Sequence, residues 1–403
     1  MTRPAVAVVA TYYRPVLGGA EAAAERLATY LHRRGHRVVV LTKRTSEAHA
    51  PVETIDDVVV ERLPPVGERS SLGKWVALRS IYNGLIRHRR DVDVVCCIDY
   101  RGIGLAALAA RARTGIPVIF QAQTEGVISG ARVRAWCQKI GASPQGSLAS
   151  LATWPIRTIY GRADAIGCIS RSIEREALAA GVARDRVHYL PNPVDTLVFS
   201  PVASDARQAI RDRLGLPRDS VVAAFVGRLS REKGVLELVR AWAQANPHAL
   251  LILIGPEMTD HPWDVSAAAR TIVAENGSAD SVRFLGGQPA ASVASWLRAS
   301  DFSVQQSHFE AMGLAAAEAM AVGLPVIASD TGGYRDFIVH EQNGLLVPPH
   351  DVHALAGAIL RLAGDAALRA RLGRQARLTA EQFDETVVLE RFAELIDRLA
   401  AAR

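Results

Sequence analysis

Short apolar segments alternate with longer segments of helical spacing along the whole chain. In the first half, seven segments rich in β-branched residues predict strands at 6–10, 37–42, 58–63, 92–98, 118–121, 165–169 and 187–190. Between the first two, Leu27 and Leu31 share one face of a predicted helix over 21–34, and Gly35 follows at a position typical of a helix C-terminus. Strands that are apolar throughout and separated by helices predict a parallel sheet covered on both faces.

The alternation stops near Pro191-Asn192-Pro193, and a polar stretch runs from there to about Ser220. It then restarts, with predicted strands at 221–226, 250–254, 282–285, 302–305, 326–328 and 345–347. We therefore predict an α/β protein of two Rossmann-like, doubly wound domains, residues 1–195 and 196–380. A last helix is predicted over 381–403 and could return to the first domain. Because open parallel sheets bind ligands at the carboxyl ends of their strands, we expect the two domains to face a common cleft.

Composition narrows the class of protein. The 403 residues are 49% hydrophobic and 22% charged, which is typical of a globular enzyme and excludes a disordered or fibrous chain. No apolar run approaches the roughly 18 residues of a membrane span. The residues after the first apolar segment do not form a signal-peptide cleavage site, so we expect a cytoplasmic protein. Four cysteines, none in a Cys-x-x-Cys pair, predict buried free thiols and neither a zinc site nor disulfides: Cys96, Cys97, Cys137 and Cys168.

Charge is unevenly distributed around the net value of +6. Residues 1–195 hold 27 Lys and Arg against 17 Asp and Glu, a net charge of +10, whereas residues 196–403 hold 20 against 24, a net charge of −4. Either the first domain faces an anionic partner or its arginines only cover solvated faces. A high pI without an aromatic-rich basic patch does not indicate nucleic-acid binding, and we expect none.

Basic and aromatic residues alternate in one part of the first half. They are Arg132, Arg134, Lys139, Arg157 and Arg162, interleaved with Trp136, Trp154 and Ile156. This pattern predicts peripheral contact with an anionic membrane, such as the inner face of the cell membrane. Residues 138–150 are rich in Gly and Ser and show no amphipathic period, so an alternative is that this segment is only an acceptor loop.

A glycine-containing segment follows the first strand of each predicted domain. Gly18-Gly19 precedes the first helix, where backbone amides can approach an anionic ligand, although the Gly-x-Gly-x-x-Gly dinucleotide fingerprint is missing. In the second domain, Arg228 and Lys233 lie five residues apart on a loop that Gly227 and Gly234 flank. Two cations at the end of a strand could neutralise a diphosphate, whereas either one alone is more often a solvated surface charge.

Two carboxylates bracket the start of a predicted helix in the second domain. Glu310 follows the strand at 302–305, and Glu318 lies within the helix that comes next. The free amides of a helix N-terminus can hold a phosphate, and carboxylates beside it can accept hydrogen bonds from sugar and ribose hydroxyls. An exposed helical glutamate is the alternative explanation of Glu318. Gly332-Gly333 and Asn343-Gly344 then mark turns at the next strand ends.

Taken together, these segments resemble the retaining glycosyltransferases of family 4, which have the GT-B fold. The resemblance covers nearly the whole chain and rests on Gly18-Gly19-Ala20-Glu21, Pro191-Asn192-Pro193-Val194-Asp195, Gly227-Arg228-Leu229, Lys233-Gly234, Glu310 to Glu318, Gly332-Gly333 and Asn343-Gly344-Leu345-Leu346-Val347. It implies that a nucleotide-sugar donor binds mainly to the second domain and a hydroxyl acceptor to the first. The implied donor is a UDP-sugar, or alternatively a GDP-sugar, used with no cofactor and no metal.

The resemblance also implies roles for individual residues. Arg228 and Lys233 would bind the diphosphate, Glu318 the ribose and Glu310 the donor sugar. The phosphate site would be completed by Gly18, Gly19 and the backbone of Met312, Gly313 and Leu314, and the loop at Gly286 would lie near the base. The acceptor would meet Gln123, Thr124 and Glu125.

The chain departs from the family pattern at two places. Gln123 stands where many members have a histidine, and Asp336 stands where a glutamate is usual after Gly-Gly. A glutamine cannot take a proton, which fits a front-side mechanism in which the leaving phosphate accepts the proton of the acceptor. In that mechanism Arg228 and Lys233 stabilise the charge that develops on the phosphate.

Other functions remain open at this point. A nucleotide-sugar epimerase, a hydrolase or a phosphorylase shares the fold, but it should carry catalytic carboxylates and histidines, or a cofactor lysine, in the first domain, where only Glu125 is a candidate. A catalytically silent nucleotide-sugar-binding subunit stays possible because of Gln123. The missing fingerprint argues against a nicotinamide dehydrogenase.

Overall fold

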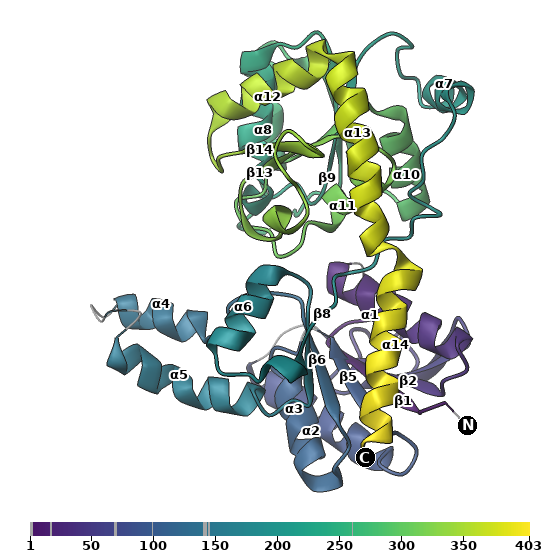
Figure 1. Ribbon diagram of the computed structural model, residues 1–403, viewed down its shortest axis with the longest axis vertical. Coiled ribbons are helices and arrows are strands. Elements are labelled where there is room, and N and C mark those ends of the chain that lie inside the picture. The colour runs from purple at the N-terminus through teal and green to yellow at the C-terminus, as the bar shows by residue number, and fades with distance from the viewer. Residues whose placement is uncertain are drawn as a thin grey trace. The chain divides into compact units, whose positions relative to one another are not determined.

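The computed structural model describes residues 3–16, 18–67, 71–98, 100–139, 143, 146–259 and 261–403. The chain divides into two compact units (Figure 1). Unit 1 comprises Met1–Asn192 and Thr386–Arg403, and unit 2 comprises Pro193–Glu385. The expected boundaries at 195 and 380 lie within a few residues of these divisions. Both units have the predicted α/β architecture with a mainly parallel sheet, which confirms the fold class.

Within the described residues, unit 1 is built on an eight-stranded sheet of order β3-β4-β2-β1-β5-β6-β7-β8. The strands are β1 Val6–Ala10, β2 Val38–Lys43, β3 Val52–Ile55, β4 Val58–Leu63, β5 Val94–Ile98, β6 Val118–Ala122, β7 Ala165–Cys168 and β8 Val187–Tyr189. All neighbours are parallel except β3 and β4. All seven predicted strands are present, and β3 was missed. It is a short edge strand with partly exposed side chains, joined to β4 by a turn in which Asp56 and Asp57 both have positive φ.

Helices surround this sheet and one of them comes from the end of the chain. The helices of unit 1 are α1 Gly19–Arg33, α2 Ser71–Arg87, α3 Ile103–Thr114, α4 Ala131–Lys139, α5 Ser147–Tyr160, α6 Arg171–Ala179 and α14 Glu385–Ala401. Figure 1 shows α4 and α5 side by side, extending away from the sheet of unit 1. Among the described residues, no helix is both long and apolar enough to cross a membrane. The four cysteines are buried, as predicted.

The last helix, α14, returns to unit 1 as expected. Its Phe392 and Ile396 are buried with Leu27 and Leu31 of α1 in one apolar cluster. At the rim of this contact, the Glu390 carboxylate accepts a hydrogen bond of 2.7 Å from the Tyr30 hydroxyl and pairs with Arg34. The predicted start of this helix at residue 381 is wrong, because Asp384 leaves helical geometry with a ψ of 135°. A short 3-10 turn, η5 Glu381–Phe383, therefore precedes a helix that begins at Glu385.

Within the described residues, unit 2 has a six-stranded, wholly parallel sheet of order β11-β10-β9-β12-β13-β14. The strands are β9 Val222–Val226, β10 Leu250–Ile254, β11 Val282–Gly286, β12 Phe302–Gln305, β13 Val326–Ser329 and β14 Gly344–Val347. All six are at predicted positions. Strand order reverses between β9 and β12, and such a switch point is where open α/β sheets bind ligands.

The helices of unit 2 are α7 Ser204–Arg213, α8 Val235–Ala245, α9 Ser266–Glu275, α10 Ala290–Ala299, α11 Leu314–Ala321, α12 Val352–Gly364 and α13 Ala366–Ala380. The sequence interpretation missed α7, which lies in the polar stretch after Pro193. This helix has few apolar side chains and is anchored instead by buried Arg211, whose guanidinium lies 2.7 Å from the Asp301 carboxylate. Pairing with a residue ninety positions away leaves no periodic signal in the local sequence.

Candidate active site

Two loops leave the carboxyl ends of β9 and β12 at the switch point of unit 2. The first runs from Gly227 through the 3-10 turn η2 Arg231–Lys233 to α8, and the second runs from Gln306 to α11. Gly234 makes their close approach possible. Its φ is 66°, and a Cβ there would overlap the carbonyl group of Gln306. The His308 amide donates a 2.8 Å hydrogen bond to the Glu232 carbonyl oxygen, which joins the two loops directly.

This approach brings two predicted donor-binding residues together. The Lys233 ammonium donates a hydrogen bond of 2.6 Å to a carboxylate oxygen of Glu310, and both side chains are largely buried. The Ser307 hydroxyl lies 3.3 Å from the same oxygen. A cation and a carboxylate thus meet directly before α11, where helix amides favour negative charge.

A third loop packs against the backbone of the loop that carries Glu310. It is the 3-10 turn η4 Gly332–Asp336, which follows β13. A Cβ at Gly332 or at Gly333 would overlap backbone atoms of the Glu310 loop, and the Gly333 amide donates a 2.8 Å hydrogen bond to the Glu310 carbonyl oxygen. The sequence analysis interpreted this glycine pair as a turn and as part of the family resemblance. Its structural role is to let one backbone lie against another.

Two residues that the sequence interpretation did not single out complete this arrangement. Tyr334 is buried, its hydroxyl lies 3.2 Å from the Ser307 hydroxyl, and its ring fills the space that a Cβ at Gly313 would need. Burial raises the pKa of Tyr334 well above its usual range, and the nearby Glu310 carboxylate raises it further. The phenol therefore stays neutral and can donate a hydrogen bond. A lone serine and a tyrosine outside a known motif carry no sequence signal for this role.

The remaining donor-binding candidates of unit 2 surround this pair. Met312 is buried, Gly313 has a φ of 91° and caps α11, and Leu314 is the first residue of that helix. Glu318 lies in the second turn of α11 and is half-buried. Arg228 is half exposed and pairs with Glu232, within its own loop. It lies at the end of β9, as expected, but its ion pair is not with Glu310.

Gly286 lies farther along the same sheet edge. It ends β11, two strands from β9, with a φ of 67°. Its carbonyl oxygen accepts a 2.9 Å hydrogen bond from the Gly255 amide, and Gly227 donates in the same way to Ile254. The carboxyl ends of β9, β10 and β11 are thus joined in one row.

In unit 1, the acceptor candidates follow β6. Gln123 is buried and exchanges two amide hydrogen bonds with Asn192, of 3.0 and 2.9 Å. Asn192 belongs to the Pro-Asn-Pro segment, so the structure joins two motifs that are 69 residues apart. Thr124 is half-buried and Glu125 is exposed. The Glu176 carboxylate anchors the next turn by accepting hydrogen bonds from backbone amides, including that of Gly126 at 2.7 Å.

Gly18 and Gly19 lie at the start of α1 in the same unit, and both are exposed. Gly19 is the first residue of the helix, so the predicted start at residue 21 is two positions late. A Cβ at Gly19 would meet nothing within 4 Å, and Gly18 has an extended φ of −178°. At Gly19, neither backbone conformation nor packing therefore requires glycine, unlike at Gly234. A Cβ at Gly18 would overlap the carboxylate of Glu21, which is the end of a flexible side chain. Leu17 lies outside the described residues.

Both halves of the chain match families of known glycosyltransferases. Residues 17–197 match the family described as Glycosyltransferase Family 4, and residues 206–379 match Glycosyl transferases group 1. D-inositol 3-phosphate glycosyltransferase of Xylanimonas cellulosilytica is 32% identical over 94% of this chain and 93% of its own length. The enzyme of the same name from Mycolicibacterium smegmatis is 30% identical over 85% of this chain and 78% of its own.

Solved structures share the fold over the whole chain. Sucrose-phosphate synthase from Thermosynechococcus elongatus superposes with a TM-score of 0.82, at 26% identity and full coverage of both chains. The Anabaena protein HepE, solved with UDP and glucose, gives a TM-score of 0.76 at 19% identity, covering 98% of this chain and 99% of its own. The relatives from Xylanimonas cellulosilytica and Mycolicibacterium smegmatis are named glycosyltransferases, so neither an epimerase nor a silent binding subunit is favoured. The chain therefore belongs to the family 4, group 1 glycosyltransferases, enzymes of the GT-B fold.

Proposed function

We propose that this glycosyltransferase moves a sugar from a UDP-sugar to a hydroxyl acceptor with retention of configuration and without a metal ion. The observation that carries the proposal is the Lys233–Glu310 pair of 2.6 Å, held by glycine-dependent loop contacts at the N-terminus of α11. In this pair the two charges neutralise each other. With donor bound, Lys233 and Arg228 would turn to the diphosphate, and Glu310 would accept hydrogen bonds from the sugar hydroxyls.

The other groups of the donor would lie along the carboxyl-terminal edge of the sheet of unit 2, from α11 toward β11. The amides of Gly313 and Leu314 would meet a phosphate, Glu318 the ribose hydroxyls, and the turn at Gly286 the base. Gly19 would let the diphosphate approach the start of α1, which agrees with the open space around it. GDP-sugar is the alternative donor, because no residue discussed above selects a base.

Retention would result from a front-side displacement. The bond between the anomeric carbon and the leaving phosphate breaks, the acceptor oxygen forms its bond on the same face, and the acceptor proton passes to the leaving phosphate. Gln123 supports this mechanism because an amide cannot act as a base. Its Nε2 and Oε1 each make one hydrogen bond to Asn192, so a second N–H and a second lone pair can orient the acceptor.

For the acceptor, we propose an anionic hydroxyl compound and D-inositol 3-phosphate as the first to test. Two observations support this choice: the name of the relatives, and the net charge of +10 on residues 1–195. A second candidate is a lipid-linked acceptor at the inner face of the cell membrane. It is supported by exposed Trp136 on α4 and by Leu151 and Trp154 on α5, which are 57%, 72% and 63% exposed. The side chains of Arg132 and Arg134 lie outside the described residues.

The direct test is a transfer assay with a panel of UDP-, GDP- and ADP-sugars, in which the product anomer is read by NMR. We expect Lys233→Ala and Glu318→Ala each to lower kcat/KM about 10²–10³-fold, because a charge-assisted contact in the transition state contributes about 2–4 kcal/mol. Arg231→Ala removes an exposed cation from the same 3-10 turn and should leave the rate unchanged. Near-normal rates in folded Lys233→Ala enzyme, or an inverted product, would overturn the proposal.

A further inference from the structure

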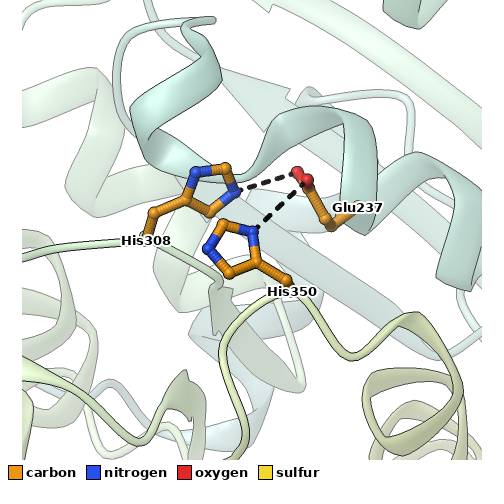
Figure 2. A group of neighbouring side chains, drawn as sticks. All are labelled: Glu237, His308 and His350. Atoms are coloured by element: carbon orange, nitrogen blue, oxygen red, sulfur yellow. Dashed lines mark ion pairs between the residues drawn. The ribbon is translucent and has the colours of Figure 1, made fainter.

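A second cluster of reactive side chains lies in unit 2, among residues to which the proposed function gives no role. Figure 2 shows Glu237, His308 and His350 turned toward one another. They come from three elements: Glu237 from the first turn of α8, His308 from the loop after β12, and His350 from the loop between β14 and α12. One potential ligand atom from each lies within 4.8 Å of the other two.

The distances are close to those of a metal site. His308 Nε2 lies 3.2 Å from Glu237 Oε2, and His350 Nδ1 lies 3.9 Å from Glu237 Oε1. The two imidazole rings have centroids 3.9 Å apart. Ligand atoms around a tetrahedral zinc ion, with bonds of about 2.0–2.1 Å, lie roughly 3.3 Å from one another. Small side-chain rotations would bring all three groups to one ion.

Two of these atoms need a partner. Within the part of the chain that the structure describes, His308 Nε2 and Glu237 Oε2 are both buried and neither has a hydrogen-bond partner. They face each other across 3.2 Å without the alignment of a hydrogen bond. A buried polar atom left unsatisfied costs about 1–3 kcal/mol, and a cation between them would satisfy both.

We propose that Glu237, His308 and His350 bind a transition-metal ion of the Zn²⁺ class. Imidazole and carboxylate together suit Zn²⁺, whereas Mg²⁺ and Ca²⁺ prefer ligand sets made only of oxygen. Three protein ligands leave a fourth position for water. The thiols of Cys96 and Cys168 do not compete for the ion, because burial raises the pKa of Cys168 to about 12 and that of Cys96 further still.

The site is tied to the donor-binding loops by sequence and by hydrogen bonding. His308 precedes Glu310 by two residues, and its amide bonds to Glu232, the neighbour of Lys233. A bound ion would hold the β12–α11 loop against α8 and against the loop before α12. This site has no part in the proposed transfer chemistry, which needs no metal, so its occupancy must be measured as binding.

The test is titration calorimetry of tag-free, chelator-stripped protein with ZnCl₂ and, separately, with MgCl₂. We expect one saturable Zn²⁺ per chain, no Mg²⁺ binding, and a higher Tm with Zn²⁺. His350→Asn should weaken Zn²⁺ binding at least about tenfold. Removal of a residue that only supports a metal ligand already weakens metal binding about 10–100-fold, and His350 is proposed to be a ligand itself. Asparagine suits this position because His350 has a φ of 63°, which asparagine tolerates. Glu237→Gln should weaken binding to a similar extent.

The matched control is His353→Asn. His353 is exposed, lies three residues from His350 and contacts Gln244 instead of the cluster. This variant should bind Zn²⁺ as the wild type does. The proposal is overturned if stripped protein takes up no stoichiometric Zn²⁺, or if His353→Asn weakens binding as much as His350→Asn. Tm values without metal show whether each variant is folded.

Discussion

Glycine residues in unit 2 determine how closely the active-site loops approach. Gly234 and Gly332 both have positive φ, and a Cβ at either position would overlap backbone atoms of the loop that carries Glu310. Gly19 in unit 1 is different, because the space around it is open and its backbone is helical. The first two glycines are therefore needed for folding, and the third is free to serve a ligand.

This difference gives a paired prediction. Gly234→Ala should lower the free energy of unfolding by about 2 kcal/mol or more, since a left-handed alanine alone costs about 1–2 kcal/mol and the overlap adds to it. Gly19→Val should leave Tm unchanged and reduce transfer, because its side chain would occupy the space given to the diphosphate. Thermal unfolding and kcat/KM of both variants check this. Full activity in Gly19→Val would remove Gly19 from the donor site.

At the level of residues, the sequence indicated candidate charged residues better than it indicated contacts. Lys233 and Glu310 could be selected as candidates for the donor site because each follows a predicted strand, and parallel strands end at one sheet edge. The Gln123–Asn192 pair and the packing of Gly332 against Glu310 could not be predicted. Both contacts join residues that are far apart in sequence, and no local periodicity records such contacts.

Elements with a strong apolar pattern were predicted well, and those held by polar contacts were not. The strands of both sheets are buried and β-branched, so their positions were evident. In contrast, α7 depends on the ion pair of Arg211 with Asp301, and β3 is a half-exposed edge strand. Helix ends were also misplaced, as at Glu385, because the backbone turn at Asp384, with a ψ of 135°, leaves no signal in the hydrophobic pattern.

The C-terminal helix α14 is predicted to be essential for the stability of unit 1. Phe392 is 1% exposed and packs against residues of α1 and the sheet. Phe392→Ala should therefore reduce the free energy of unfolding by about 3–5 kcal/mol, the usual result of emptying a large aromatic site. Glu394→Ala changes an exposed residue of the same helix and should stay within about 0.5 kcal/mol. Chemical denaturation measures both. Equal stability of the two variants would mean that α14 is not part of the core.

For the whole molecule, the uneven charge and the exposed tryptophans lead to a prediction about membranes. The wild type should sediment with vesicles that contain anionic lipid at low salt and dissociate at high salt, because basic residues near such a surface gain about 1 kcal/mol each. Trp154→Ala, or Arg132→Glu with Arg134→Glu, should abolish this. Trp263→Ala removes a tryptophan of unit 2 that is 52% exposed and should have no effect. Wild-type protein that stays in the supernatant at low salt would favour a soluble acceptor.

Removal of metal ions tests whether sugar transfer by this protein is independent of metal. We expect transfer to continue in EDTA, because Arg228, Lys233 and the amides of α11 would neutralise the diphosphate. A lower Tm in EDTA would agree with the proposed zinc site and would not affect this expectation. If chelation stops turnover and Mg²⁺ or Mn²⁺ restores it, the phosphate site has been assigned wrongly.

The central claim is that Lys233, beside Glu310 at the start of α11, holds the diphosphate of the donor. Calorimetric titration of UDP in EDTA, with GDP for comparison, tests it without knowledge of the sugar or the acceptor. Wild type and Arg231→Ala should bind UDP equally, and Lys233→Ala should bind it about 10–100-fold more weakly, as expected when a hydrogen bond to a charged group is lost. Equal affinity in Lys233→Ala and wild type would contradict the account.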